Sequence, residues 1–130
     1  MPAVYLDSSA LVKLALREAE SDALRRHLRR RRPLVSSALA RVEVLRALLP
    51  EGDAALSRGR AVLRSIDLVR IGDRVLELAA GLAPAGLRSL DAIHLATARR
   101  LGRDLGHVVS YDERMLDAAR QLRFRTASPA

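Results

Sequence analysis

Short apolar runs alternate with amphipathic segments along the whole chain. The runs are two to four residues long, as in buried strands, and cover residues 4–6, 34–36, 68–71, 108–109 and 124–126. Between them, apolar residues recur every three or four positions, which is typical of helices packed on a sheet. Strands that alternate with helices pair in parallel through right-handed crossovers. The pattern therefore predicts an α/β fold, a three-layer α/β/α sandwich around a short, mostly parallel sheet, with residues 1–130 forming a single domain.

Serines near the start of three helical segments can accept hydrogen bonds from first-turn amides, and these are Ser8 or Ser9, Ser37 and Ser89. In the segment after Ser37, the helical spacing places four apolar side chains inward: Ala38, Val42, Leu45 and Leu49. In the first helices, Leu11, Leu14 and Leu28 are expected to offer an apolar surface for a partner helix.

Four acidic residues lie far apart in the sequence but at related places in this pattern. Asp7 and Asp112 follow expected strands, Asp91 opens a helix, and Glu43 lies between Val42 and Val44 in the helix after the second strand. In a parallel sheet, the ends of the strands share one edge, where ligands usually bind. Carboxylates gathered there repel one another unless a cation compensates them. Oxygen ligands of this kind suit Mg²⁺ or Mn²⁺, and the set predicts divalent-metal chemistry.

Each acid also has a purely structural explanation. Asp7 and Asp112 can be N-caps, Asp91 suits the first turn of a helix, and Glu43 can form a surface ion pair with Arg46. Ser9 and Ser110 stand beside the acids and can hydrogen-bond carboxylates that hold a metal. His94, flanked by Ile93 and Leu95, fits a packed, hydrogen-bonded histidine better than a ligand. His27 and His107 show no partner spacing.

Composition narrows the class of function. The chain has no cysteine, which excludes disulfides, thiolate catalysis and cysteine-bound zinc. Aromatic residues make up 2%, which argues against modules that stack bases on aromatic side chains. No apolar run approaches the length of a membrane span, and no secretory signal precedes the first strand, so a cytoplasmic protein is expected.

The net charge of +8 favours a polyanionic partner, because basic surfaces release counterions when they bind phosphates. Nearly all of the basic residues are arginines, with Lys13 as the single lysine. An arginine-rich but otherwise ordinary surface is the alternative. The candidates for phosphate contacts are Arg25, Arg26, Arg29, Arg30, Arg31, Arg32, Arg99, Arg100 and Arg103.

Four segments around the acids together resemble the PIN-domain ribonucleases, and within them the VapC toxins of toxin–antitoxin pairs. The segments are Tyr5-Leu6-Asp7-Ser8-Ser9-Ala10, Ala40-Arg41-Val42-Glu43-Val44, Leu90-Asp91-Ala92-Ile93-His94-Leu95 and Val109-Ser110-Tyr111-Asp112-Glu113. They occur in the family's order, and the similarity runs from Tyr5 to about Phe124.

The resemblance implies a PIN-like fold and a Mg²⁺- or Mn²⁺-dependent endoribonuclease with Asp7, Glu43, Asp91 and Asp112 as its acidic set. It identifies Ser9 and Ser110 with the family's polar helper residues, and it implies an RNA substrate, a homodimer and a small VapB-like antitoxin. The alternatives are a PIN nuclease that is not a toxin and a basic nucleic-acid-binding module whose acids are structural. A phosphoacceptor receiver domain fits poorly, because it needs an acidic pair after the first strand and a lysine near the last.

Overall fold

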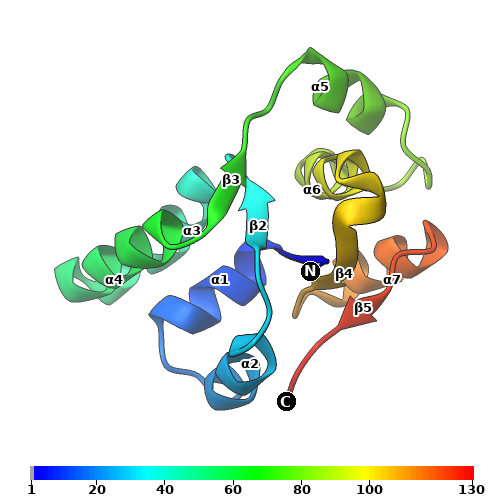
Figure 1. Cartoon of the computed structure of the whole chain (residues 1–130). Helices are drawn as coiled ribbons and strands as arrows, with labels where there is room; N and C mark the ends of the chain where they lie inside the picture. Colours follow the sequence, from blue (N-terminus) through cyan, green and yellow to red (C-terminus); the bar gives the residue numbers. More distant parts are fainter. Residues whose placement is uncertain (1) are drawn as a thin grey trace.

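The computed structural model describes residues 2–130, which form a five-stranded parallel sheet (Figure 1). Its strands are β1 (Ala3–Leu6), β2 (Leu34–Ser37), β3 (Asp67–Val69), β4 (Leu105–Val109) and β5 (Thr126–Ala127), in the order β3-β2-β1-β4-β5. The chain builds the sheet outward from β1 to β3 and then crosses to the other side for β4 and β5. The end of β1 therefore lies at a topological switch point, where open α/β sheets place their ligands.

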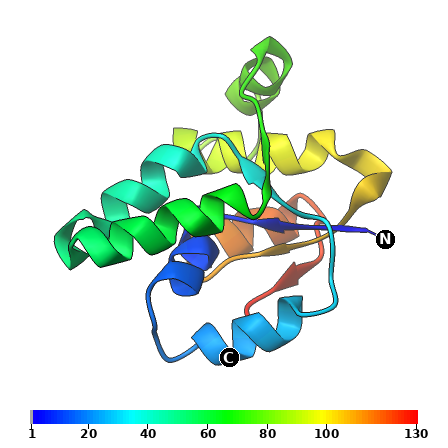
Figure 2. The ribbon, with the colours of Figure 1, turned by 60° about the vertical axis from the view of Figure 1, so that its left-hand side comes forward.

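Helices cover both faces of the sheet (Figure 2). One face carries α1 (Ser8–Ala15), α2 (Ser21–Leu28), α3 (Ala40–Leu48) and α4 (Asp53–Arg64). The other carries α6 (Ser89–Arg100) and α7 (Glu113–Gln121), with α5 (Asp73–Ala80) packed on α6. Two 3-10 turns, Leu49–Glu51 and Gly102–Asp104, complete the elements. The predicted three-layer α/β/α sandwich is confirmed, with every pair of neighbouring strands parallel.

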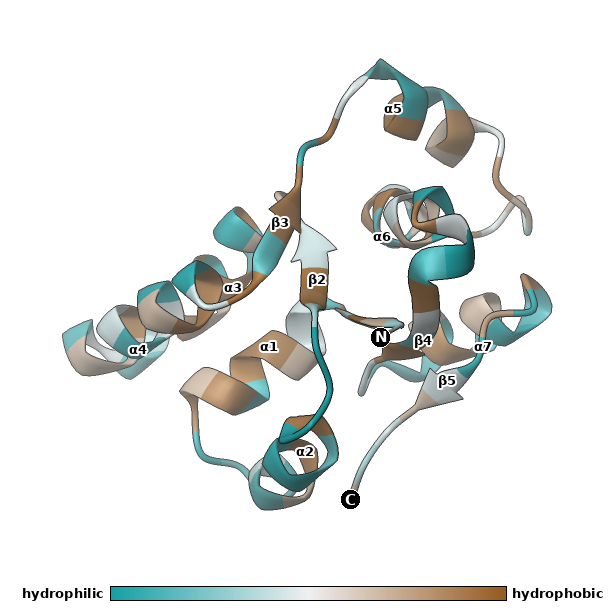
Figure 3. Cartoon of the chain, in the orientation of Figure 1, coloured by the Kyte–Doolittle hydropathy of each residue, from teal (hydrophilic) through white to brown (hydrophobic). Residues whose placement is uncertain are grey.

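The central strand β1 divides its side chains between two cores, because successive residues of a strand point to opposite faces. Val4 and Leu6 join the larger core under α1 to α4, whereas Ala3 and Tyr5 face α6. All four side chains are buried. Figure 3 shows in brown the hydrophobic residues of the strands and helices. A strand covered on both faces explains why its sequence is continuously apolar.

The buried stripe of α3 differs from the predicted one. Ala40, Val44 and Leu48 are buried, whereas Val42 is 58% exposed and Leu49 is 51% exposed. The predicted stripe began at Ala38, which lies before the first residue of α3. This starting point displaced the predicted buried face by about half a turn around the helix. The corrected stripe places Glu43 beside the core, at the boundary between α3 and the sheet edge.

Helix caps were also partly misassigned. Asp7 caps α1, since its Oδ1 accepts the backbone amide of Ala10 at 3.0 Å, so Ser8 and Ser9 are free for other contacts. Ser37 accepts the amide of Leu39 at 3.1 Å just before α3 begins, and Ser89 is the first residue of α6 rather than its cap.

The proposed partner surface on the first helices was wrong in part. Leu11 and Leu28 are buried in the core, and only Leu14 is partly accessible. Within residues 2–130, none of the helices combines the length and apolar character needed to span a bilayer.

Candidate active site

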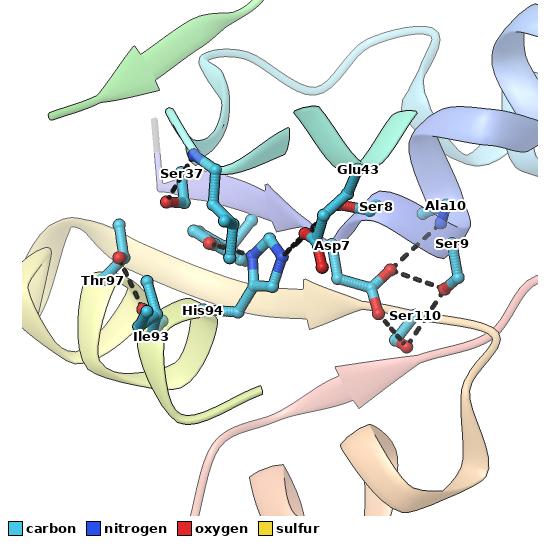
Figure 4. A network of polar contacts seen from close by, with 12 residues as sticks. Asp7, Ser8, Ser9, Ala10, Ser37, Glu43, Ile93, His94, Thr97 and Ser110 are labelled. Atoms are coloured by element: carbon cyan, nitrogen blue, oxygen red, sulfur yellow. Dashed lines mark hydrogen bonds and ion pairs between the residues drawn. The ribbon is translucent and has the colours of Figure 1, made fainter. Parts of the chain in front are cut away.

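Asp7 lies at the centre of the site, at the end of β1, and is 3% exposed. Its Oδ1 accepts hydrogen bonds from the Ser9 hydroxyl at 2.6 Å and from the Ala10 amide, while its Oδ2 accepts one from the Ser110 hydroxyl at 2.5 Å (Figure 4). Ser110 directly follows β4, the neighbour of β1 in the sheet. The two ends of adjacent strands thus hold this carboxyl in one orientation.

Burial raises the pKa of the Asp7 carboxyl, although the hydrogen bonds from Ser110, Ser9 and the Ala10 amide act to lower it. Burying an ionised carboxylate away from water costs free energy unless a cation lies close to it. The surroundings of Asp7 therefore favour a bound positive ion, which would compensate the charge that the protein leaves unbalanced.

Glu43 is held from the opposite side by His94. The Nε2 of His94 lies 2.6 Å from Oε1 of Glu43, and its Nδ1 lies 2.7 Å from the Tyr5 hydroxyl. The Ser8 hydroxyl donates to the same Oε1 at 2.6 Å (Figure 4). Tyr5 comes from β1, Ser8 from α1 and His94 from α6, so three elements fix the position of one carboxyl group.

The contacts of Glu43 determine its charge and the donor of one hydrogen bond. Burial acts to raise the pKa of Glu43, but the hydrogen bonds from His94 and Ser8 outweigh it and hold the pKa below its ordinary value. An ionised Glu43 only accepts, so Nε2 of His94 donates the hydrogen bond between the two side chains. Both ring nitrogens of His94 are satisfied, and Oε2 of Glu43 has no hydrogen-bond partner among residues 2–130.

Asp91 and Asp112 complete the acidic edge. Burial raises the pKa of Asp91, and the negative charges of Asp112 and Asp7 raise it further. Asp112 caps α7, since its Oδ1 accepts the amides of Arg114 at 2.9 Å and Met115 at 3.4 Å. The structural explanation of Asp112 as a cap is confirmed. The negative charge of Asp112 nevertheless also acts on Asp91, as that of Asp7 does. Three of the four acids therefore lie close enough to interact electrostatically.

The carboxylate oxygens at this edge are suitable ligands for a hard divalent cation such as Mg²⁺. The described residues contain no preformed group of three or more His, Cys, Asp or Glu side chains at metal-binding spacing. Mg²⁺ does not need such a cage, because it usually keeps several waters and takes one or two carboxylates directly. Asp7, Asp91 and the free oxygen of Glu43 are suitable for that kind of site.

Comparison with known proteins agrees with this geometry. The PIN domain family matches residues 4–121. The chain belongs to the PIN domain family. A relative from Mycobacterium tuberculosis named ribonuclease VapC46 is 62% identical over 130 residues, which cover 100% of both chains.

Two solved structures share the fold of this PIN domain at lower identity. The crystal structure of M. tuberculosis VapC20, described as a sarcin–ricin-loop-cleaving toxin, has a TM-score of 0.73 and 17% identity, covering 88% of this chain and 94% of that one. A toxin–antitoxin complex from Klebsiella pneumoniae has a TM-score of 0.74 and 19% identity, covering 98% of both chains. These likenesses concern the fold.

The arginines selected from sequence lie away from the acidic edge of the PIN domain. One group lies in the last turn of α2 and in the segment between α2 and β2, namely Arg25, Arg26, Arg29, Arg30, Arg31 and Arg32. The other lies at the end of α6 and in the 3-10 turn before β4, namely Arg99, Arg100 and Arg103. Residues that precede parallel strands lie at the opposite edge from residues that follow them. Four of the nine selected arginines also bind the protein itself, because each donates to a backbone carbonyl: Arg25 to Leu14, Arg31 to His27, Arg32 to Leu28 and Arg99 to Leu122. Their role in RNA binding stays a prediction.

Sequence reasoning missed the support of Glu43 and a pair of histidines. The sequence pattern gives no signal for the roles of Tyr5 or Ser8. The prediction that His94 is packed and hydrogen-bonded is confirmed, although the pattern could not name its partners Tyr5 and Glu43. The alternative ion pair of Glu43 with Arg46 is wrong, because the structure pairs Glu43 with His94. His27 and His107, for which no partner was expected, contact each other through their Nε2 atoms at 2.8 Å between α2 and β4. No spacing in the sequence relates residues 80 or 89 positions apart, so these pairs depend on the fold.

Replacing Asp91 by asparagine should stabilise the metal-free PIN domain at neutral pH. A carboxyl with a raised pKa in the folded state stabilises the fold below its unfolded value of about 3.8, and this stabilisation is lost as pH rises through the folded-state pKa. In EDTA, we therefore expect Asp91→Asn to melt at or above the wild-type temperature near pH 7, with the difference growing from acidic to neutral pH.

The same melts in Mn²⁺ test the ligand role of Asp91. A metal that binds only the folded state stabilises it by about 2.7 kcal/mol at a concentration 100 times Kd. Wild type should gain stability from Mn²⁺, and Asp91→Asn should gain much less. A loss of several degrees in EDTA together with an undiminished Mn²⁺ response would mean that Asp91 serves only the start of α6.

Proposed function

We propose that the protein is a Mg²⁺- or Mn²⁺-dependent endoribonuclease that acts as the toxin of a toxin–antitoxin pair. The acidic edge is the observation that supports this proposal. The charges of Asp7 and Asp112 act on Asp91 there. Glu43 is held in position by His94 through one carboxylate oxygen, and its other oxygen is free. The 62% identity to a protein named as a VapC ribonuclease over the full chain supports the same activity.

Asp7 and Asp91 are the principal candidates to hold the cation, with Glu43 and Asp112 completing its surroundings. A divalent ion bound there would activate water for attack on a phosphodiester and offset the charge of the leaving oxygen. Ser9 and Ser110 keep the Asp7 carboxyl aimed at this position, through hydrogen bonds to its two oxygens. Ser110 also accepts the Asp112 amide at 3.0 Å, which ties the start of α7 to the same point.

Glu43 serves as a fixed anion rather than as a nucleophile. His94 and Ser8 occupy one carboxylate oxygen and lower the pKa of the group, so it stays ionised at neutral pH. Its second oxygen can accept a hydrogen bond from water or contact the cation. Hydrolysis by a metal-activated water needs no covalent bond between a side chain and RNA. The hydroxyls of Ser8, Ser9 and Ser110 accordingly donate to carboxylates and hold them in place.

A toxic ribonuclease must be inhibited in the cell that makes it, and we propose that a small antitoxin protein binds this chain. We also propose that the chain forms a homodimer. An unrestrained ribonuclease would degrade the RNA of its own cell. The solved relative described as a toxin–antitoxin complex shares this fold at 19% identity, which makes a protein partner reasonable for this chain. Leu11 and Leu28 cannot bind that partner directly, because the core buries them.

The test is RNA cleavage by the purified full chain. Cleavage should occur in Mg²⁺ or Mn²⁺, stop in excess EDTA and return when the metal is restored. Expression of the wild type alone should arrest growth, and co-expression of a small gene encoded beside it should relieve the arrest. Cleavage that continues in EDTA would contradict the metal mechanism, while active protein that leaves growth unaffected would indicate a PIN nuclease that is not a toxin.

A further inference from the structure

A basic groove lies between α3, α4 and β3, on the flank of the sheet beyond β2. Its volume is about 480 Å³. Apolar side chains form part of its wall, namely those of Ala38, Leu45, Leu63 and Leu68, and four arginines surround it: Arg41, Arg60, Arg64 and Arg70. Among the described residues, no acidic side chain lines the groove. We call it the arginine groove.

The four arginines are exposed to solvent. Within residues 2–130, none of their guanidinium groups takes part in an ion pair or a side-chain hydrogen bond. Other arginines of the chain are engaged: Arg17 pairs with Asp22, and Arg58 donates to the Ala15 carbonyl. Like charges that gather without acids repel one another, so this groove suits a ligand that brings several negative charges.

One end of the groove, formed by Arg41 and Arg70, lies at the same edge of the sheet as the acids, and from there the groove runs along β3 toward Arg60 and Arg64 in the last turns of α4. Arg70 directly follows β3, whose last residue, Val69, pairs with Ser37 at the end of β2. Arg41 lies in the first turn of α3, two residues before Glu43. The end of β3 lies two strand spacings from the end of β1, roughly 10 Å. A single RNA strand cleaved at the acids can therefore reach the groove within a few nucleotides.

We propose that the arginine groove binds the phosphate backbone of single-stranded RNA on one side of the cut. This inference rests on the proposed function and adds a binding path to it. The guanidinium groups contact phosphates, while the apolar wall of Leu45, Leu63 and Leu68 accommodates sugar or base surface. The groove carries affinity and leaves the chemical step to the acids. Phosphate contacts are independent of sequence, so it sets no base preference.

The test compares two double variants that remove equal charge from exposed sites. Arg60→Gln with Arg70→Gln removes two groove cations, whereas Arg120→Gln with Arg123→Gln removes two exposed cations at the end of α7, away from the groove. Binding of a fluorescent single-stranded RNA is measured in EDTA by anisotropy over a salt series. For single strands, each lost phosphate contact reduces the slope of log K against log salt by about 0.7. The groove variant should lose about 1.4 from this slope and bind roughly tenfold more weakly at low salt.

The control variant should keep the wild-type slope and affinity. In Mg²⁺, the groove variant should show a raised KM and a kcat within about twofold of wild type, because the groove contacts are made equally in ground and transition states. An unchanged slope in the groove variant overturns the inference, as does an equal loss of slope in the control variant, which would mean that only the net charge of the protein matters. The wild type's own cleavage in Mg²⁺ tests the proposed function separately. A wild type that binds RNA through the groove without cleaving it would reject the nuclease and keep the groove.

Discussion

Asp7→Asn is expected to reduce metal-dependent RNA cleavage roughly a thousandfold, equivalent to about 4 kcal/mol of transition-state stabilisation. Asparagine keeps the side-chain oxygen that caps α1 and accepts from Ser9 and Ala10. Its amide nitrogen replaces Oδ2 and can donate to the Ser110 hydroxyl, so the local contacts survive. What disappears is the negative charge that would hold a cation.

The measurement is the rate of cleavage under single-turnover conditions, together with circular dichroism and thermal melting to confirm the fold. Asp117→Asn is the matched control, because Asp117 is exposed, forms an ion pair with Arg120 at 3.1 Å and lies on α7. Its cleavage rate should stay within about twofold of wild type, as expected for removal of a surface ion pair. Wild-type rates in Asp7→Asn would exclude Asp7 from the metal site.

Cleavage by the wild type should also rise with pH over the range in which Asp7 and Asp91 lose their protons. Their pKa values are raised, and a carboxyl must be ionised to bind a divalent cation. Metal affinity should therefore be lower in mild acid, and binding should release protons. Calorimetric titration with Mn²⁺ in buffers of different ionisation enthalpy measures both effects, and an affinity independent of pH would contradict a site built on these two acids.

His94→Ala is expected to lower the free energy of unfolding by about 2–4 kcal/mol, a cavity plus an unsatisfied buried hydroxyl. His94 is 2% exposed and joins Tyr5 to Glu43 across 89 and 51 residues of sequence. Its loss leaves the buried Tyr5 hydroxyl without its hydrogen-bond partner 2.7 Å away. The melting temperature should fall by roughly 10 °C for a domain of this size.

Activity and metal response distinguish a positioning role from simple packing. In His94→Ala, Glu43 keeps the Ser8 hydrogen bond but loses the one from His94, so the stabilisation by Mn²⁺ and the rate of cleavage should both fall below wild type at a temperature where the variant is folded. The control is Thr97→Val, one turn along the same helix, because the Thr97 hydroxyl donates to the Ile93 carbonyl of its own helix. That variant should lose stability by about 1 kcal/mol and keep its Mn²⁺ response. Equal metal responses in the two variants would reduce His94 to a packing residue.

The sequence by itself determined the class of fold and the composition of the acidic edge. Strands that alternate with helices pair in parallel within one sheet. Residues that directly follow parallel strands lie at the same edge of that sheet, whatever the details of side-chain packing. The order of apolar and polar positions was therefore enough to place Asp7, after β1, and Ser110, after β4, at the same edge. Charge and the absence of cysteine restricted the chemistry further, because neither depends on conformation.

Only the tertiary structure decided which side chains meet across that edge. The contacts of Tyr5, Ser8 and Glu43 with His94 join three helices and a strand, and the arginine groove joins α3, α4 and β3. Such contacts depend on the rotation of each helix about its axis, and an error of a single residue in an expected stripe changes that rotation by about 100°. Local patterns fix the period of a helix, but its phase against the sheet is fixed by the packing of the whole core.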